Sequence, residues 1–245
     1  MNPVEPEMAK RLCASTRKVA LALTRAQVVV APPAIYLGLL TGSRAGKSKK
    51  FALAAQDASA ELSGAYTGEV SQAMVKNLGV EYLIIGHSER RKAGEENLLI
   101  NKKVKSAIKL DFKIILCVGE WVRDNDGNYL KTLEEQLMSA FKGVTKLEMK
   151  NVLIAYEPVW AIGAQATVSD TPEGFTEQAL FIRKILNNIF GKEVAMSVPI
   201  LYGGSVDAGN ASGFLNEGEA NGLLVGRSSL TIQEFTKILK IADGN

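Results

Sequence analysis

Short apolar runs alternate with stretches of helical periodicity along the whole chain, and this alternation restricts the fold more than any other feature. In residues 98–110, 130–142 and 176–190, apolar side chains recur at every third or fourth position. A succession of strand, helix and strand predicts parallel pairing through right-handed crossovers. The short runs are apolar on both faces, as strands covered by helices require. Seven runs predict strands, at residues 28–31, 51–55, 82–86, 113–118, 152–156, 199–202 and 222–225.

The length of the chain fits one large domain of this alternating kind. For 245 residues the pattern predicts a single domain over residues 1–245, an α/β (β/α)8 TIM barrel. The chain opens with a predicted helix at roughly residues 5–25, whereas a closed eight-stranded barrel begins with a strand. We therefore expect eight helices, seven strands and a barrel that lacks its first strand in this chain.

Composition excludes several classes of function. Hydrophobic residues make up 47% of the chain, but no run reaches the ~18 apolar residues of a membrane span, so no membrane partner is expected. A net charge of +3 is too small to predict nucleic-acid binding and is compatible with a small anionic substrate. One histidine and two distant cysteines, Cys13 and Cys117, cannot form a His/Cys metal cluster or a disulfide framework. We expect no metal, no cofactor and a cytoplasmic location.

The segment Ala155-Tyr-Glu-Pro-Val-Trp-Ala-Ile-Gly163 contains the first candidate for catalysis. The predicted strand 152–156 stops at Glu157, because Pro158 cannot continue a ladder. In α/β sheets, ligands bind at the carboxyl ends of the strands. Glu157 is therefore a candidate general base beneath a closable loop that carries Trp160. The alternative is a strand-end glutamate that pairs with a nearby lysine.

Three further runs end in residues that suit a site at the same edge. His87 follows the run 82–86, Gly203-Gly-Ser205 follows the run 199–202, and Gly226 ends the last run. Glycine turns that open onto helix N-termini at two consecutive strand ends are typical of the phosphate site of a barrel. Each feature alone has a structural alternative, namely a turn for the glycines and a core histidine for His87.

A series of motifs in the same order resembles the triosephosphate isomerase family over essentially the whole chain. The motifs are Ala65-Tyr-Thr-Gly-Glu-Val70, Gly86-His-Ser-Glu-Arg-Arg91, Cys117-Val-Gly-Glu120, Tyr156-Glu-Pro-Val-Trp-Ala-Ile-Gly163, Tyr202-Gly-Gly-Ser-Val206 and Gly222-Leu-Leu-Val-Gly226. The resemblance implies interconversion of dihydroxyacetone phosphate and D-glyceraldehyde 3-phosphate, without metal or cofactor. It also implies a homodimer formed through residues 64–70, Gly64 to Val70, in which Thr67 reaches the partner.

The resemblance assigns a role to each matching residue. Glu157 is the base that moves the proton between two substrate carbons, and His87 is the neutral donor to the carbonyl, a division of roles for which this enzyme is itself a standard example. Glu89 orients a catalytic lysine, and residues 158–168 form a lid that excludes water. Phosphate is bound by main-chain N–H groups at Gly163, Ser205, Gly226 and Arg227.

Three departures from the family pattern stand out. The lid reads Ala164-Gln-Ala-Thr-Val168 with an apparent two-residue extension, Ser169-Asp170. Arg227 replaces a residue that is usually glycine. Arginine keeps the main-chain N–H, so this group can still bind phosphate if φ of residue 227 is negative. The family begins with a strand that carries Asn and Lys before Met-Asn-Pro, and that strand does not precede Met1 here.

Two other interpretations remain open at this point. The chain could be a barrel remnant that binds a phosphate ligand or acts as a scaffold without catalysis. It could also be another phosphate-binding barrel, such as a sugar-phosphate epimerase, although that group needs metal-binding histidines. Retention of Glu157, His87 and the glycine turns together favours the isomerase.

We expect the 245-residue chain as written to be a poor enzyme, and an added first strand ending in Asn-Trp-Lys to rescue it. Loss of one electrostatic donor at a site typically costs about 10²–10³ in turnover, and an unpaired strand edge adds a risk of aggregation. Isomerisation of dihydroxyacetone phosphate measured on both chains tests this. Equal turnover would show that the added segment has no catalytic role.

Overall fold

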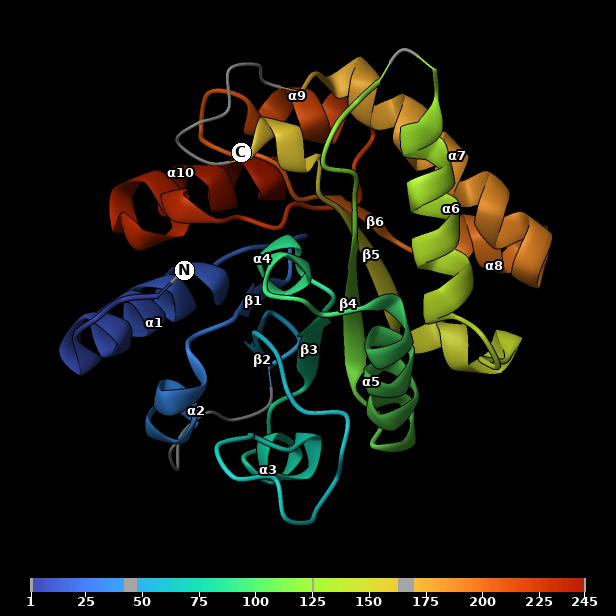
Figure 1. The fold of residues 1–245 in the computed structure, drawn as a ribbon. Coiled ribbons are helices and arrows are strands. Elements are labelled where there is room, and N and C mark those ends of the chain that lie inside the picture. Colours follow the sequence, from blue (N-terminus) through green and yellow to red (C-terminus); the bar gives the residue numbers. More distant parts are fainter. Residues whose placement is uncertain (1, 42–47, 125, 163–169, 245) are drawn as a thin grey trace.

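The chain forms one curled parallel sheet with helices on its outer face. The computed structural model describes residues 2–41, 48–124, 126–162 and 170–244. All strand pairs are parallel, and the order in the sheet follows the order in the chain, β1 to β6. This is the α/β architecture of a TIM barrel, as predicted (Figure 1). The strands are β1 (Val28–Val30), β2 (Phe51–Ala55), β3 (Tyr82–Ile85), β4 (Lys113–Val118), β5 (Val152–Tyr156) and β6 (Ile200–Tyr202).

The seventh predicted strand is reduced to a single point of pairing. In the run 222–225, Leu223 forms an isolated parallel bridge with Tyr202 of β6. Two backbone hydrogen bonds hold it there, from Tyr202 N to Gly222 O at 3.0 Å and from Leu224 N to Tyr202 O at 2.8 Å. The run therefore continues the sheet in the expected direction. At the other edge, β1 has β2 as its one neighbour within the described ranges.

The described residues form ten α-helices, two more than the eight expected, and the predicted ranges 98–110, 130–142 and 176–190 correspond to α5, α6 and α7. The crossover from β3 to β4 contains α4 as well as α5, and the crossover from β5 to β6 contains α8 as well as α7, because Gly191 with φ +92° interrupts the chain there. No described helix is both long and apolar enough to cross a membrane. The α-helices are α1 (Pro6–Ala20), α2 (Ala34–Leu40), α3 (Gln72–Asn77), α4 (Ser88–Lys92), α5 (Asn97–Lys109), α6 (Asn128–Ala140), α7 (Pro172–Phe190), α8 (Lys192–Ser197), α9 (Ala211–Asn216) and α10 (Ile232–Asp243), with 3-10 turns η1 (Lys146–Asn151), η2 (Val159–Ala161) and η3 (Arg227–Leu230).

Alternate residues along the strands face different apolar clusters. On β4, Ile114 and Leu116 pack with side chains from α5, α6 and α7, whereas Ile115 and Cys117 pack only with residues from the strands and their ends. This period of two is inherent in a β-strand. The second cluster is therefore the inner face of the curled sheet, and it contains small side chains that fit a narrow interior, among them Ala52, Ala54 and Ala155.

Helix α1 ends at Ala20, whereas the predicted helix ran to about residue 25, because the backbone N–H groups of residues 24–26 are bonded to another helix. The carboxylate of Asp243, at the end of α10, accepts hydrogen bonds from the backbone N–H groups of Thr24, Arg25 and Ala26 at 2.6–3.0 Å. It also accepts one from the Thr24 hydroxyl at 3.1 Å. These contacts fix the turn between α1 and β1 against α10, and α1 and α10 lie side by side (Figure 1).

Replacing Asp243 by Asn should lower the melting temperature by several degrees, because an amide cannot accept the whole set of bonds. The backbone bonds hold the pKa of Asp243 well below its ordinary value. Their stabilisation is therefore complete above the pKa of an unfolded aspartate, about 3.9, and is lost as the pH falls through the lower folded pKa. Urea unfolding at pH 7 and at pH 3 measures the difference. Glu134→Gln, at an exposed position of α6, is the control and should change little. An Asp243→Asn protein as stable as the original would contradict this role.

Candidate active site

Glu157 lies directly after the last paired residue of β5, where Pro158 ends the strand. Its backbone N–H donates to Val118 O at 2.8 Å, which extends the contact with β4 by one residue. The side chain points into the structure and is only 2% exposed. A Cβ atom at Gly203 would lie 3.1 Å from Cγ of Glu157, so glycine at the end of β6 leaves room for this side chain. The predicted base is thus placed at the carboxyl edge of the sheet.

His87 contacts Glu157 from the end of β3. Its Nε2 lies 3.1 Å from Oε1 of Glu157, and the backbone N–H of Ser88 donates to Oε2 at 2.7 Å. The other ring nitrogen of His87, Nδ1, accepts the backbone N–H of Glu89 at 3.2 Å and caps helix α4. An imidazole nitrogen that accepts a hydrogen bond carries no proton, so in the neutral ring the proton is on Nε2. We assign the tautomer that donates towards Glu157.

Burial dominates the proton affinity of Glu157. Removal from water raises the pKa of the carboxyl above its ordinary value, and His87, the Ser88 N–H and the Cys117 thiol oppose that shift. Burial also raises the pKa of Cys117 well above its usual value, with the Glu157 carboxylate as a second cause. The thiol therefore stays protonated and can donate. A base with raised proton affinity is suited to abstract a proton from carbon.

A second buried carboxyl group, that of Glu120, fixes the segment after Pro158. Its Oε1 accepts the Tyr156 hydroxyl at 2.8 Å and Nε1 of Trp160 at 2.7 Å. Val159 N donates to the backbone oxygen of Glu120 at 3.0 Å. Burial raises the pKa of Glu120, and the bonds from Trp160 and Tyr156 oppose the shift. The first part of the predicted lid is thereby attached to the end of β4.

The two predicted phosphate turns are joined to each other and to the lid. Ser205 Oγ donates to Ala161 O at 2.9 Å, and Ser228 Oγ, in the turn that begins at Arg227, donates to Val206 O at 2.6 Å. Gly226 has φ −84°, and Arg227 is not among the described residues with positive φ. Both Gly226 and Arg227 are exposed. Arginine therefore fits this position without backbone strain.

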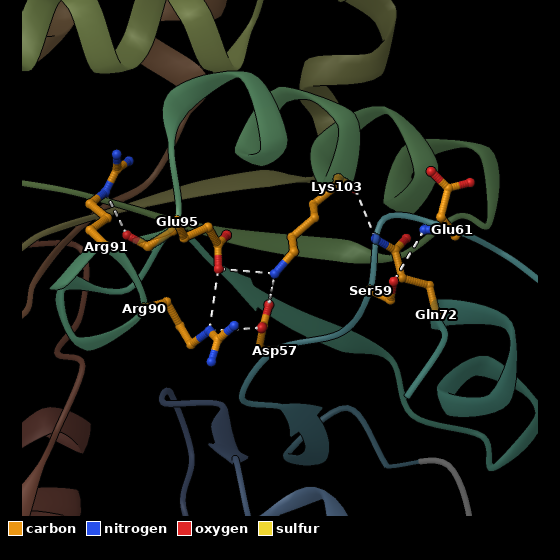
Figure 2. Close-up of polar contacts among 9 residues, drawn as sticks. Asp57, Ser59, Glu61, Gln72, Arg90, Arg91, Glu95 and Lys103 are labelled. Atoms are coloured by element: carbon orange, nitrogen blue, oxygen red, sulfur yellow. Dashed lines mark hydrogen bonds and ion pairs between the residues drawn. The ribbon is translucent and has the colours of Figure 1, made fainter. Parts of the chain in front are cut away.

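A cluster of four charged side chains, of which Lys103 and Glu95 are buried and Arg90 is half exposed, supports helix α4 from the other side (Figure 2). Lys103 Nζ lies 2.6 Å from Oδ1 of Asp57 and 3.0 Å from Oε2 of Glu95. Arg90 Nε lies 3.0 Å from Oδ2 of Asp57 and 3.3 Å from the same oxygen of Glu95. Burial raises the pKa of Asp57, and Lys103 opposes the shift. The cluster connects α4 and α5 to the segment after β2.

Some predicted site residues remain apart from this group. Glu89 takes part through its backbone N–H, while the residue itself is exposed. Gly163 and residues 164–168 of the lid lie outside the described residues. Within the described ranges, no group of three or more His, Cys, Asp or Glu side chains is arranged to hold a metal ion.

Sequence reasoning missed the groups that orient His87 and Glu157. The donor at Ser88 is a backbone N–H, which no side-chain pattern reveals. The Glu120 motif was recognised, but its bonds to Tyr156 and Trp160 depend on tertiary contacts. Arg91 had a readable signal, since it follows His87 by four residues and so lies one helical turn further on.

Comparison with known proteins agrees with this geometry. A family model described as triosephosphate isomerase matches residues 1–242. The chain belongs to this family. The triosephosphate isomerase of Chloroherpeton thalassium is 45% identical over 193 residues, which are 78% of this chain and 76% of that protein. That of Alkaliphilus oremlandii is 43% identical over 218 residues, 88% and 86% of the two chains. That of Caldanaerobacter subterraneus is 42% identical over 217 residues, with the same coverage of 88% and 86%.

Membership of the triosephosphate isomerase family confirms the predicted family and the expected enzyme class. The matched range contains the strand ends that carry Glu157 and His87 and both glycine turns. It therefore decides against a sugar-phosphate epimerase. The non-catalytic scaffold is not favoured either, because the relatives with which the chain aligns are named as isomerases.

Proposed function

We propose that the chain interconverts dihydroxyacetone phosphate and D-glyceraldehyde 3-phosphate through an enediolate, as a single barrel domain over residues 1–245. The observation that carries this proposal is the contact between Nε2 of His87 and Oε1 of Glu157 at 3.1 Å. It joins a buried carboxylate to the protonated nitrogen of a neutral imidazole. Proton abstraction next to a carbonyl needs this combination, a base for the carbon and a donor for the oxygen.

In the proposed reaction, Glu157 takes the proton from one substrate carbon and returns it to the neighbouring carbon. His87 donates Nε2–H to the carbonyl oxygen, which stabilises the negative charge that develops there. The bond from Glu89 N–H to Nδ1 holds the ring in the donating tautomer. The neutral imidazole of His87 also passes a proton between the two oxygens, from the hydroxyl of the first carbon to the former carbonyl oxygen, so with both protons transferred Glu157 and His87 end the cycle unchanged.

The phosphate is proposed to bind to the main chain at the two turns and at the start of the lid. Supporting this, Ser205 and Arg227 belong to turns linked by the Ser228 bond to Val206, and Ser205 is bonded to Ala161 of η2. The N–H groups of Ser205, Gly226, Arg227 and Gly163 are the proposed donors. Glu89 is proposed to orient a cationic side chain near the substrate, and its exposed carboxylate leaves it available for that contact.

In the version that carries the added first strand, Glu157→Gln should lower kcat by about 10²–10⁴-fold, since only proton transfer is lost, and should leave binding of glycerol 3-phosphate nearly unchanged. Isomerase assays and calorimetry measure the two quantities. Because burial raises the pKa of Glu157, kcat/KM of the original enzyme should fall on acidification at a pH above the ordinary pKa of glutamate, about 4.3.

Glu173→Gln, an exposed position on α7, is the control for this change and should retain full turnover. A Glu157→Gln enzyme with near-normal kcat would remove the base from the proposal. Absence of turnover both in the 245-residue chain and in the version with the added first strand, with glycerol 3-phosphate still bound, would favour the scaffold instead.

We also propose that the chain forms a homodimer through residues 64–70 and works in the cytoplasm. All residues from 61 to 70 are exposed, including the apolar side chains of Leu62, Tyr66 and Val70. The base of this loop is closed by a bridge between Ser59 and Ser71. A loop whose two ends are fixed and whose exposed part carries apolar side chains is suited to insertion into a partner. Both cysteines are free and buried, as a reducing compartment allows.

Tyr66→Glu should shift the protein towards monomer, because it places a charge in the proposed interface. Sedimentation velocity over a range of protein concentrations measures the change. Leu180→Glu, at a residue that is 63% exposed on α7, is the matched control and should keep the original sedimentation. Equal association of Tyr66→Glu and the original chain would show that this loop is not the interface.

A further inference from the structure

The ladder between β3 and β4 stops just before the site. Its last pair is Ile85 with Leu116. The residue after β3 is Gly86, which directly precedes His87. The next residue of β4 is Cys117, whose thiol contacts Glu157. Gly86 has φ +73°, a left-handed conformation that turns the chain out of the strand and towards α4. The two strands separate where the catalytic pair must be aligned.

One arginine side chain bridges this separation. Nε of Arg91 donates to Gly86 O at 2.8 Å, and Nη2 donates to Cys117 O at 3.1 Å. Nη1 donates to Oδ1 of Asn97, at the start of α5, at 2.7 Å. A Cβ atom at Gly86 would approach Nη2 to 3.1 Å and Cys117 O to 3.2 Å, so glycine leaves space for the guanidinium. The planar fork thus makes hydrogen bonds to both strand ends.

The two neighbouring arginines of α4 act on opposite sides. Arg90 belongs to the charged cluster with Asp57 and Glu95, whereas the guanidinium of Arg91 points away from it (Figure 2). The backbone N–H of Arg91 also donates to His87 O at 3.0 Å. Arg91 therefore donates to the carbonyl groups of both Gly86 and His87, and these two bonds fix the segment that leads into helix α4.

We propose that Arg91 is a positioning residue, whose bridge between Gly86 O and Cys117 O fixes the peptide before His87 and so directs Nε2–H towards the reacting centre. The inference rests on the proposed role of His87. Arg91 itself touches neither Glu157 nor the place for substrate in the contacts described above. Burial lowers the pKa of Arg91, and the Glu157 carboxylate is among the groups that oppose this. A cation here also favours the ionised base.

The chain offers an exceptional readout for this inference, because it contains one histidine. With ¹⁵N-labelled histidine, the two ring signals belong to His87 in every variant, and their shifts report which nitrogen carries the proton. The original chain should give an acceptor-type Nδ1 and a protonated Nε2. Arg91→Lys keeps a positive charge but cannot bridge two carbonyls, so the two ring signals should move towards each other as tautomers mix.

Turnover provides the second readout. Misplacement of a catalytic group by about 1 Å can cost about a hundredfold in rate, so Arg91→Lys should lower kcat by up to that factor while KM stays within about twofold. KM should change little because the Arg91 guanidinium bonds to Gly86, Asn97 and Cys117, and not to the proposed phosphate turns after β6. Arg183 is the matched control, since its guanidinium donates to Ala195 O and Val198 O, before β6 and away from the site. Arg183→Lys should lower thermal stability and leave kcat and the His87 signals as they are.

The outcomes separate the possible roles of Arg91. An unchanged His87 spectrum in folded Arg91→Lys, with kcat no lower than in Arg183→Lys, would overturn the proposal. If Arg91→Lys does not fold, Asn97→Ala, which removes one anchor of the guanidinium, decides by the same spectrum: tautomer mixing supports the proposal, and an unchanged spectrum contradicts it. The NMR spectrum reports the tautomer of His87, whereas the Glu157→Gln test reports turnover. A negative result in one measurement therefore does not decide the other.

Discussion

The parallel ladder between β4 and β5 is the constraint on which the site depends. It pairs five successive residues, from Ile114 with Val152 to Val118 with Tyr156. The next backbone bond, from Glu157 N to Val118 O, fixes the proposed base as though it were a sixth position of the strand. A carboxylate so placed cannot move with the loop that follows it unless the backbone bond is broken. The rigidity of the sheet is transferred directly to the side chain that we propose as the base.

This placement has a cost, because a buried carboxylate loses its hydration. Such a group is stable only where hydrogen bonds replace the lost water. Here the replacement comes from His87, from the Ser88 N–H and from the Cys117 thiol, which belong to β3, α4 and β4 or their ends. The partial compensation leaves the pKa of Glu157 raised. Each donor is therefore both a support of the fold and a control on the pKa of Glu157.

Much of the architecture could be read from the sequence, because apolar runs directly mark buried parallel strands. The predicted bounds of β2, β4 and β5 agree with those found. Helices α4 and α8 were missed, since helices of five and six residues are too short for the apolar spacing to repeat. His87 and Glu157 were predicted by their positions at strand ends. The contact of Asp57 with Lys103 was not, because it joins residues 46 positions apart and depends on the packed tertiary structure.

The charged cluster behind α4 has a consequence for the electrostatics of the site. Asp57 and Glu95 contribute two negative charges, and Arg90 and Lys103 contribute two positive ones, so in their ionised forms the group is neutral. The field of a balanced group decays faster with distance than the field of a single ion. Helix α4 therefore gains polar anchors that add no net charge near the carboxylate of Glu157. Beyond burial, the pKa of Glu157 is set by the groups that contact it, namely His87, Ser88 and Cys117, and no member of the charged cluster is among them.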